Sequence, residues 1–112
     1  PPRSTLFPYT TLFRSDLIHK KSGLLKYFDF ILTREDYSKS KPHPEPYLAA
    51  LEKSGCEIDE CLVVEDSLRG LISAGEAGIK CAVIPGALTA GCDFSKAWKV
   101  LSTIKELPSV LY

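Results

Sequence analysis

The chain has 112 residues, of which 45% are hydrophobic and 25% charged, and its formal net charge is zero. This composition is typical of one small globular domain, and the balanced charge gives no electrostatic reason to expect binding to nucleic acid or to a membrane. The sequence has no apolar run long enough to span a bilayer, and we expect no signal peptide. The four cysteines form no Cys-x-x-Cys pair, so we expect reduced thiols in a cytoplasmic protein.

The first fifteen residues differ in character from the rest of the chain. Residues 1–15 contain no acid and show neither helical nor strand periodicity. Their sequence resembles, codon by codon, the in-frame translation of a common short-read sequencing adapter, so we interpret them as a non-native segment. The alternative is a natural proline-containing N-terminal arm. Because residues 1–15 are interpreted as non-native, we assign the domain itself to residues 16–112.

The next part of the chain alternates short apolar and polar segments. Residues 16–22 carry the pattern of a helix end, and Gly23 is a suitable residue to close it. Residues 30–32, Phe-Ile-Leu, predict a short strand. Residues 33–40 are polar and charged, which predicts a loop.

A stiff proline-rich turn then leads into a helix. Residues 41–46 read Lys-Pro-His-Pro-Glu-Pro, and prolines at alternate positions hold a backbone extended. The last proline suits the first turn of a helix, which we expect to end at Gly55. Its buried face is expected to carry Tyr47, Leu48 and Leu51.

An acidic pair follows the next predicted strand. Residues 61–64, Cys-Leu-Val-Val, predict a buried parallel strand, and Ser67 predicts the N-cap of the helix that follows. Glu65 and Asp66 lie between them, at the edge where open α/β sheets bind ligands. Because adjacent carboxylates repel each other, a positive group should lie near them, and Mg²⁺ is the natural candidate. Arg69, in the helix, is interpreted as a solvated residue, with a contact to a phosphate or a partner as the alternative.

The rest of the chain continues the alternation. Residues 80–85 and 98–101 predict strands, separated by a flexible loop at 86–91, and residues 104–107 predict a final helical turn. Trp98 is interpreted as a core residue. Strand–helix alternation of this kind predicts an α/β fold with a parallel sheet and right-handed crossovers. The predicted strands and helices are few for such a sheet, which indicates part of a larger domain.

The candidate functional residues each have an alternative interpretation. Taken alone, Lys41 would be a solvated surface lysine, but a fixed lysine near a carboxylate-bound cation can hold a phosphate. Glu65 and Asp66 could instead stabilise the dipole of the following helix, although that role needs only one acid. His43 could contact a substrate from the Lys41 loop, or it could only pack or cap within that loop.

Two motifs together resemble the haloacid dehalogenase-like (HAD) hydrolases, in particular the phosphatase and β-phosphoglucomutase-like branch. The first is Lys-Pro-His-Pro-Glu-Pro-Tyr at residues 41–47, and the second is Val-Val-Glu-Asp-Ser at 63–67 with the helix at 70–78. The resemblance runs from about Asp16 to the end of the chain. It implies an α/β fold: the C-terminal part of a Rossmann-like three-layer parallel-sheet core, with the cap domain and the first strand missing.

The resemblance also implies a chemistry. Lys41, as a catalytic residue, would neutralise the charge of the nucleophile and of the phosphate of a small phosphorylated metabolite. Asp66, with Glu65, would hold Mg²⁺. The family's reaction passes through a phospho-aspartate, in which the metal and lysine screen the phosphoryl charge. The family's nucleophile motif, Asp-x-Asp-x-Thr/Ser, is absent, because Asp16 and Asp29 do not lie in that pattern. The resemblance therefore predicts a fragment of a Mg²⁺-dependent phosphohydrolase that is inactive as this chain.

Three alternatives differ from this prediction. A phosphosugar mutase of the same branch would share these motifs. A signalling receiver domain also combines acids, Mg²⁺ and a lysine, but its acids come first, whereas here Lys41 precedes Glu65 and Asp66. A non-catalytic α/β binding module would keep the fold without the reaction. The substrate and the oligomeric state are left open by the sequence.

Overall fold

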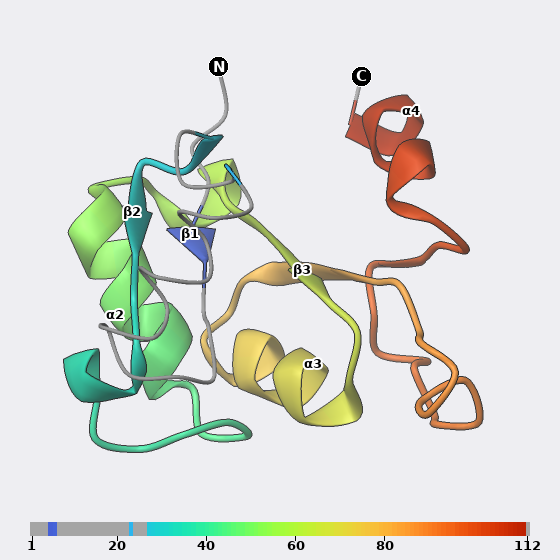
Figure 1. Ribbon diagram of the computed structural model, residues 1–112, viewed down its shortest axis with the longest axis horizontal. Helices are drawn as coiled ribbons and strands as arrows, with labels where there is room; N and C mark the ends of the chain where they lie inside the picture. Colours follow the sequence, from blue (N-terminus) through green and yellow to red (C-terminus); the bar gives the residue numbers. More distant parts are fainter. Residues whose placement is uncertain (1–4, 7–22, 24–26, 112) are drawn as a thin grey trace.

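The computed structural model describes residues 5–6, 23 and 27–111, and these form an α/β structure whose strand pairs are all parallel (Figure 1). In one sheet, β1 (Thr5–Leu6) pairs with β2 (Phe30–Ile31). The other sheet contains three strands in chain order: β3 (Leu62–Glu65), β4 (Lys80–Val83) and β5 (Lys99–Val100). The expected parallel α/β fold is therefore confirmed.

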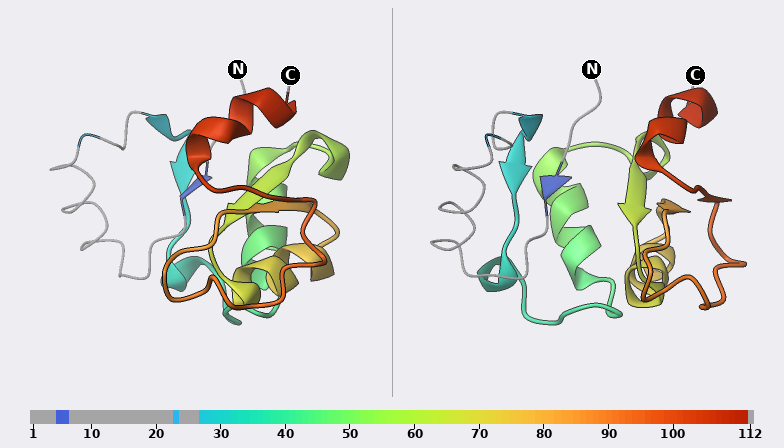
Figure 2. Two further views of the ribbon diagram at one scale, coloured as in Figure 1. Left: turned by 90° about the vertical axis from the view of Figure 1, so that its right-hand side faces the viewer. Right: turned by 45° about the vertical axis from the view of Figure 1, so that its right-hand side comes forward.

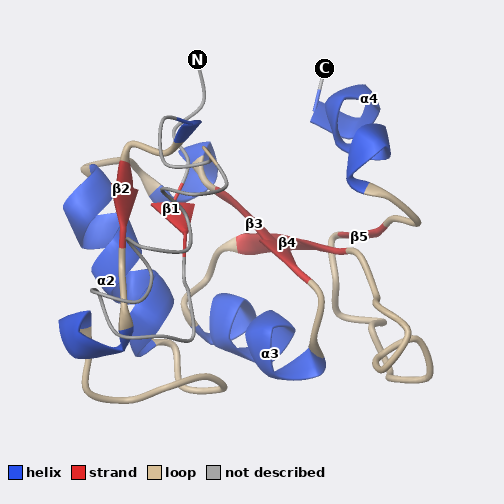
Figure 3. Cartoon of the chain, viewed as in Figure 1, coloured by secondary structure: helices blue, strands red, loops and turns tan. Residues whose placement is uncertain are grey.

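The helices lie around these sheets in a simple arrangement. Three α-helices are described, in order α2 (Glu45–Ser54), α3 (Leu68–Glu76) and α4 (Leu107–Leu111), with single 3₁₀ turns at residues 34–36, 58–60 and 104–106. α3 packs against β3 and β4 and also contacts α2 (Figure 3). In the right-hand view of Figure 2, α2 is seen between β2 and β3. Within the described ranges, no helix is long and apolar enough to cross a bilayer.

The helix boundaries follow the local signals in the sequence. Pro46 lies in the first turn of α2, and the helix ends at Gly55, whose φ of 69° is in the left-handed region that glycine adopts readily. The backbone N–H of Gly55 donates to the carbonyls of Leu51 and Glu52 at 3.2 and 3.3 Å. At the start of α3, the Ser67 side chain accepts the N–H of Gly70 at 3.1 Å, so the predicted N-cap is confirmed.

Some expectations about burial are wrong. Leu48 was expected on the buried face of α2, but it is 44% exposed, because the adjacent Tyr47 occupies that face and successive helical residues point about 100° apart. Val64 was expected in a fully buried strand, but it is 40% exposed. Side chains alternate along β3, so Val63 and Glu65 face the core while Val64 points to the other face. Trp98 is only half-buried, with the ammonium groups of two lysines 5.5 and 5.8 Å from its ring centroid.

Other expectations concern the N-terminal part of the chain. The helix end predicted at residues 16–22 lies outside the described residues, whereas Gly23, which was expected to close it, has a φ of 74°. Two residues of the adapter-like segment form β1, so this segment contributes backbone to the pairing with β2.

The core lies between α3 and the β3–β4–β5 sheet. Small residues on α3, such as the fully buried Ser73 and Ala74, allow its backbone to approach the strands closely. The core contains nine buried residues: Tyr47, Val63, Leu71, Ala74, Ala77, Ile79, Cys81, Val83 and Phe94. Burial in this core, with a smaller effect from the Glu65 carboxylate, raises the pKa of the Cys81 thiol to about 12.

The raised pKa of Cys81 predicts a loss of stability at alkaline pH. Above the ordinary thiol pKa of 9.0 the unfolded chain loses this proton, while the folded chain keeps it up to about pH 12. The free energy of unfolding should therefore fall between these pH values, and Cys81→Ala should flatten this fall. Urea unfolding measured across the range tests this, with Cys92→Ala, at an exposed position, as the control. Equal slopes in the wild-type chain and Cys81→Ala would contradict the prediction.

Candidate functional site

The candidate site lies at the carboxyl edge of the larger sheet, where β3 and β4 end side by side. The N–H of Ile84 donates to the carbonyl of Glu65 at 2.8 Å, and the N–H of Leu101 donates to that of Val83 at 2.8 Å. These bonds fix the ends of adjacent strands at one level. The loop that follows β3 therefore starts from a fixed backbone. The carboxyl edge of a parallel sheet is also the usual place for a ligand site.

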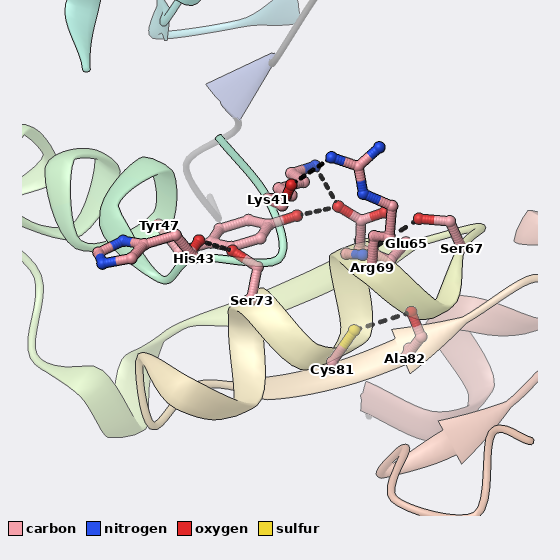
Figure 4. Close-up of polar contacts among 10 residues, drawn as sticks. Lys41, His43, Tyr47, Glu65, Ser67, Arg69, Ser73, Cys81 and Ala82 are labelled. Atoms are coloured by element: carbon pink, nitrogen blue, oxygen red, sulfur yellow. Dashed lines mark hydrogen bonds and ion pairs between the residues drawn. The ribbon is translucent and has the colours of Figure 1, made fainter. Parts of the chain in front are cut away.

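A buried carboxylate is the centre of the site. Glu65 Oε1 accepts hydrogen bonds from both the Lys41 ammonium and the Tyr47 hydroxyl, as Figure 4 shows. The Lys41 and Glu65 side chains are only 17% and 6% exposed, so both charges are largely removed from water. Burying an ionised carboxylate is costly unless it is paired and hydrogen-bonded, and Lys41 and Tyr47 together meet that requirement. The positive group expected beside the acidic pair is, for Glu65, this lysine.

Gly70 makes room for the Glu65 carboxylate. A Cβ atom at position 70 would overlap the carboxylate carbon and both of its oxygens. The carboxylate therefore lies directly against the first turn of α3, where the positive end of the helix dipole also stabilises a negative charge.

The loop that carries Lys41 is fastened to α3. The Arg69 guanidinium donates to the carbonyl of Lys41, and the Ser73 hydroxyl donates to the carbonyl of His43 at 2.7 Å. At the other end of the loop, the Glu45 carboxylate accepts the N–H groups of Ser38 and Lys39 at 2.8 and 2.9 Å. These two hydrogen bonds hold the pKa of Glu45 below its usual value.

A second loop is fastened next to Asp66. The Thr89 hydroxyl donates to the carbonyl of Asp66 at 2.7 Å and accepts the N–H of Gly86 at 3.0 Å. The loop after β4 is thereby tied to the loop after β3. The Asp66 residue itself is exposed at this edge, so its carboxylate is open to solvent.

The structure brings some of the predicted site residues together and leaves one apart. Lys41 and Glu65 are in contact, and Asp66 follows Glu65 at the same edge. In Figure 4 the His43 imidazole points away from the Glu65 carboxylate, and its Nδ1 accepts the N–H of Glu45 at 3.1 Å. His43 therefore caps its own turn in this structure, as the alternative interpretation of this residue had it.

Three side chains that support the site were not predicted from the sequence. Tyr47 was assigned to the core, and its ring is there, but its hydroxyl reaches Glu65. The hydroxyl on an otherwise apolar helix face was an available signal, because buried tyrosine hydroxyls usually find a partner. Arg69 and Ser73 carried a weaker signal, since they lie four residues apart and therefore on one face of α3.

The donor set fits a hard divalent cation in part. Glu65 and Asp66 offer adjacent carboxylates, and Asp66 is exposed. Glu65 Oε1 is occupied by Lys41 and Tyr47, which leaves Asp66 as the better donor. In the part of the chain that the structure describes, no group of three or more His, Cys, Asp or Glu side chains could hold a metal. The pair Asp66 and Glu65 nevertheless suits Mg²⁺, because this cation takes one or two carboxylates and completes its shell with water and phosphate oxygens.

Comparison with known proteins gives a consistent family. The family model for haloacid dehalogenase-like hydrolases matches residues 14–84. YhcW of Bacillus subtilis is 37% identical over 92 residues, which cover 82% of this chain and 42% of that protein. The pyrophosphatase PpaX of Bacillus cereus is 35% identical over 95 residues, which cover 82% of this chain and 44% of that protein.

Solved structures agree in fold. The crystal structure of CbbY from Rhodobacter sphaeroides in complex with phosphate matches with a TM-score of 0.84 and 30% identity, over 94% of this chain and 48% of that one. A mutant of that protein in complex with xylulose-(1,5)bisphosphate matches equally well. The chain thus spans less than half the length of these relatives.

The contact between Glu65 and Gly70 predicts the effect of adding one methyl group. Gly70→Ala forces the carboxylate away from Lys41 and Tyr47, so we expect it to lower the free energy of unfolding by about 1–3 kcal/mol in urea denaturation. The matched control is Gly75→Ala in the same helix, where a Cβ meets no atom within 4 Å. That change should be neutral or stabilising by up to about 1 kcal/mol. Equal effects of the two substitutions would show that Gly70 has no special role.

Proposed function

The chain belongs to the haloacid dehalogenase-like hydrolases, and from this premise we propose that it is part of a Mg²⁺-dependent phosphohydrolase acting on a small phosphorylated metabolite. The observation that carries the proposal is the meeting of Lys41 and Glu65 at the carboxyl edge of the sheet, next to the exposed Asp66. The phosphate and sugar-bisphosphate complexes of CbbY and the pyrophosphatase PpaX support a phosphorylated substrate.

In this proposal Lys41 binds the substrate phosphate. An ammonium group has three N–H donors, so its contact with Glu65 is compatible with a further hydrogen bond to a phosphate oxygen. Glu65 pairs with the ammonium and orients it, and Tyr47 holds the Glu65 carboxylate in turn. His43 remains a proposed substrate contact, at an exposed position on the same loop.

Asp66, with Glu65, would hold Mg²⁺. The bound cation would offset negative charge on the phosphoryl group, as it does in other phosphoryl-transfer sites. Two observations support this role for Asp66. The residue is exposed, and its carbonyl accepts a hydrogen bond from the Thr89 hydroxyl.

The reaction proposed for the whole protein passes through a phospho-aspartate. A carboxylate attacks the phosphorus, and the leaving-group oxygen departs with a proton from a general acid. The chain contains no Asp-x-Asp-x-Thr/Ser sequence to supply these two groups. We therefore propose that this chain binds the cation and phosphate but does not turn over substrate.

We also propose a cytoplasmic location for the protein. All four cysteines are free thiols, which supports this location.

Titration calorimetry of the chain with Mg²⁺ and then inorganic phosphate tests this function. Lys41→Met should weaken phosphate binding by about tenfold or more, the effect of losing a charge-assisted hydrogen bond. Asp66→Asn should weaken Mg²⁺ binding by a similar factor. The matched controls are Lys39→Met and Asp93→Asn, which change an exposed lysine and an exposed acid.

Two results would contradict the proposal. A folded chain that binds neither Mg²⁺ nor phosphate would favour the non-catalytic binding module. Hydrolysis of p-nitrophenyl phosphate by the homogeneous chain, with loss of that activity in Asp66→Ala, would contradict the proposed inactivity.

A further inference from the structure

We propose that Arg69 and Ser73 are positioning residues that hold the Lys41 loop against α3, and thereby set the place of the Lys41 ammonium beside Glu65. This clamp, defined by the two side chains, is a property of the chain itself. Its consequence for phosphate binding rests on the function proposed above.

The first observation is the pair of hydrogen bonds. The Arg69 guanidinium donates to the carbonyl of Lys41, and the Ser73 hydroxyl donates to the carbonyl of His43 at 2.7 Å (Figure 4). Arg69 and Ser73 lie four residues apart, one above the other on the same face of the helix. The carbonyls that they hold lie two residues apart on the loop. One face of α3 therefore donates hydrogen bonds to the loop on both sides of Pro42.

The second observation is that the loop has few backbone donors of its own. Pro42, Pro44 and Pro46 have no N–H group, so they cannot donate hydrogen bonds that would hold the loop. The Lys41 and His43 carbonyls instead receive donors from α3, in an exposed contact from Arg69 and a part-buried contact from Ser73. Ser73 is fully buried, so packing around it fixes the place from which its hydroxyl donates to the His43 carbonyl.

The third observation is that α3 also fixes the other partner of the ion pair. Gly70 lies between Arg69 and Ser73 in the sequence, and the Glu65 carboxylate rests on it. The helix begins at Leu68, directly after the Ser67 cap and three residues after Glu65, so its register relative to β3 is set. The first two turns of α3 thus position Glu65 through Gly70 and Lys41 through Arg69 and Ser73. A shift of the loop relative to this turn would separate the ammonium from the carboxylate.

Lysine labelling of the full chain tests the clamp directly. Trace acetylation with acetic anhydride, followed by peptide mass spectrometry, gives a relative rate for each lysine. In the wild-type chain Lys41 should react more slowly than the exposed Lys39, because its side chain is 17% exposed and paired with Glu65. In Arg69→Met/Ser73→Ala the ratio of the Lys41 rate to the Lys39 rate should rise by about three- to tenfold, the factor that corresponds to losing one or two hydrogen bonds.

A matched control separates the clamp from general effects of losing an arginine. Arg34 is also exposed and also donates to loop carbonyls, those of Tyr37 and Ser38, at 3.4 and 3.5 Å. Arg34→Met should leave the Lys41 ratio unchanged. Arg69→Lys keeps a donor on a long side chain. With Ser73 unchanged, this variant should therefore have a Lys41 ratio between those of the wild-type chain and Arg69→Met.

The outcomes distinguish the clamp from other roles. An unchanged Lys41 ratio in the double variant would overturn the proposal, and so would an equal rise for every lysine, because that would show only general loosening of the fold. If Ser73→Ala disturbs folding, Arg69→Met alone must still raise the Lys41 ratio by about twofold or more. A lower phosphate affinity in Arg69→Met with an unchanged ratio would make Arg69 a direct phosphate contact, and the clamp would be wrong. A raised ratio in a chain whose wild type binds no phosphate would support the clamp and contradict the proposed function.

Discussion

The structure of the site depends on one constraint, which is that the Glu65 carboxylate at the end of β3 is buried. Burying a carboxylate whose side chain is only 6% exposed is costly unless it is paired and hydrogen-bonded. Among the described residues, Glu65 has two such partners, Lys41 and Tyr47, which lie 24 and 18 positions earlier in the chain. The pairing therefore ties the loop before α2, the first turn of α2 and the end of β3 to one point. It also explains the glycine at position 70, because no other residue leaves room for the carboxylate there.

The same constraint connects the fold to the proposed chemistry. A parallel sheet brings the ends of its strands to one edge, and the loops that leave this edge can be fastened to one another. Here α3 fastens the Lys41 loop, and Thr89 fastens the loop after β4 to Asp66. The result is a lysine paired with the buried Glu65 at the sheet edge that also carries the exposed Asp66, which suits the binding of a phosphate and a hard cation. The other groups of the proposed reaction are not in this chain, which spans less than half the length of YhcW, PpaX and CbbY.

The sequence predicted those features that depend on local signals. The cap at Ser67, the helix end at Gly55 and the strand before the acidic pair each follow from a few neighbouring residues, and the structure has all three. The exposure of Leu48 and Val64 was not predicted, because it depends on which face of an element is covered by parts of the chain far away in sequence. The sequence also indicated that a positive group should meet the acids, but not that Lys41 itself would pair with Glu65. That pairing depends on the approach of the loop to α3.

The most direct test of this account is a double-mutant cycle on Lys41→Met and Glu65→Gln, measured by urea unfolding of the single and double variants. The account predicts a coupling free energy of about 1–3 kcal/mol, because each single change leaves a buried group without its partner. The double variant should therefore lose less free energy of unfolding than the two single variants lose in sum. Effects that add to within about 0.5 kcal/mol would show that the two side chains are independent, and would contradict the central role given to this ion pair.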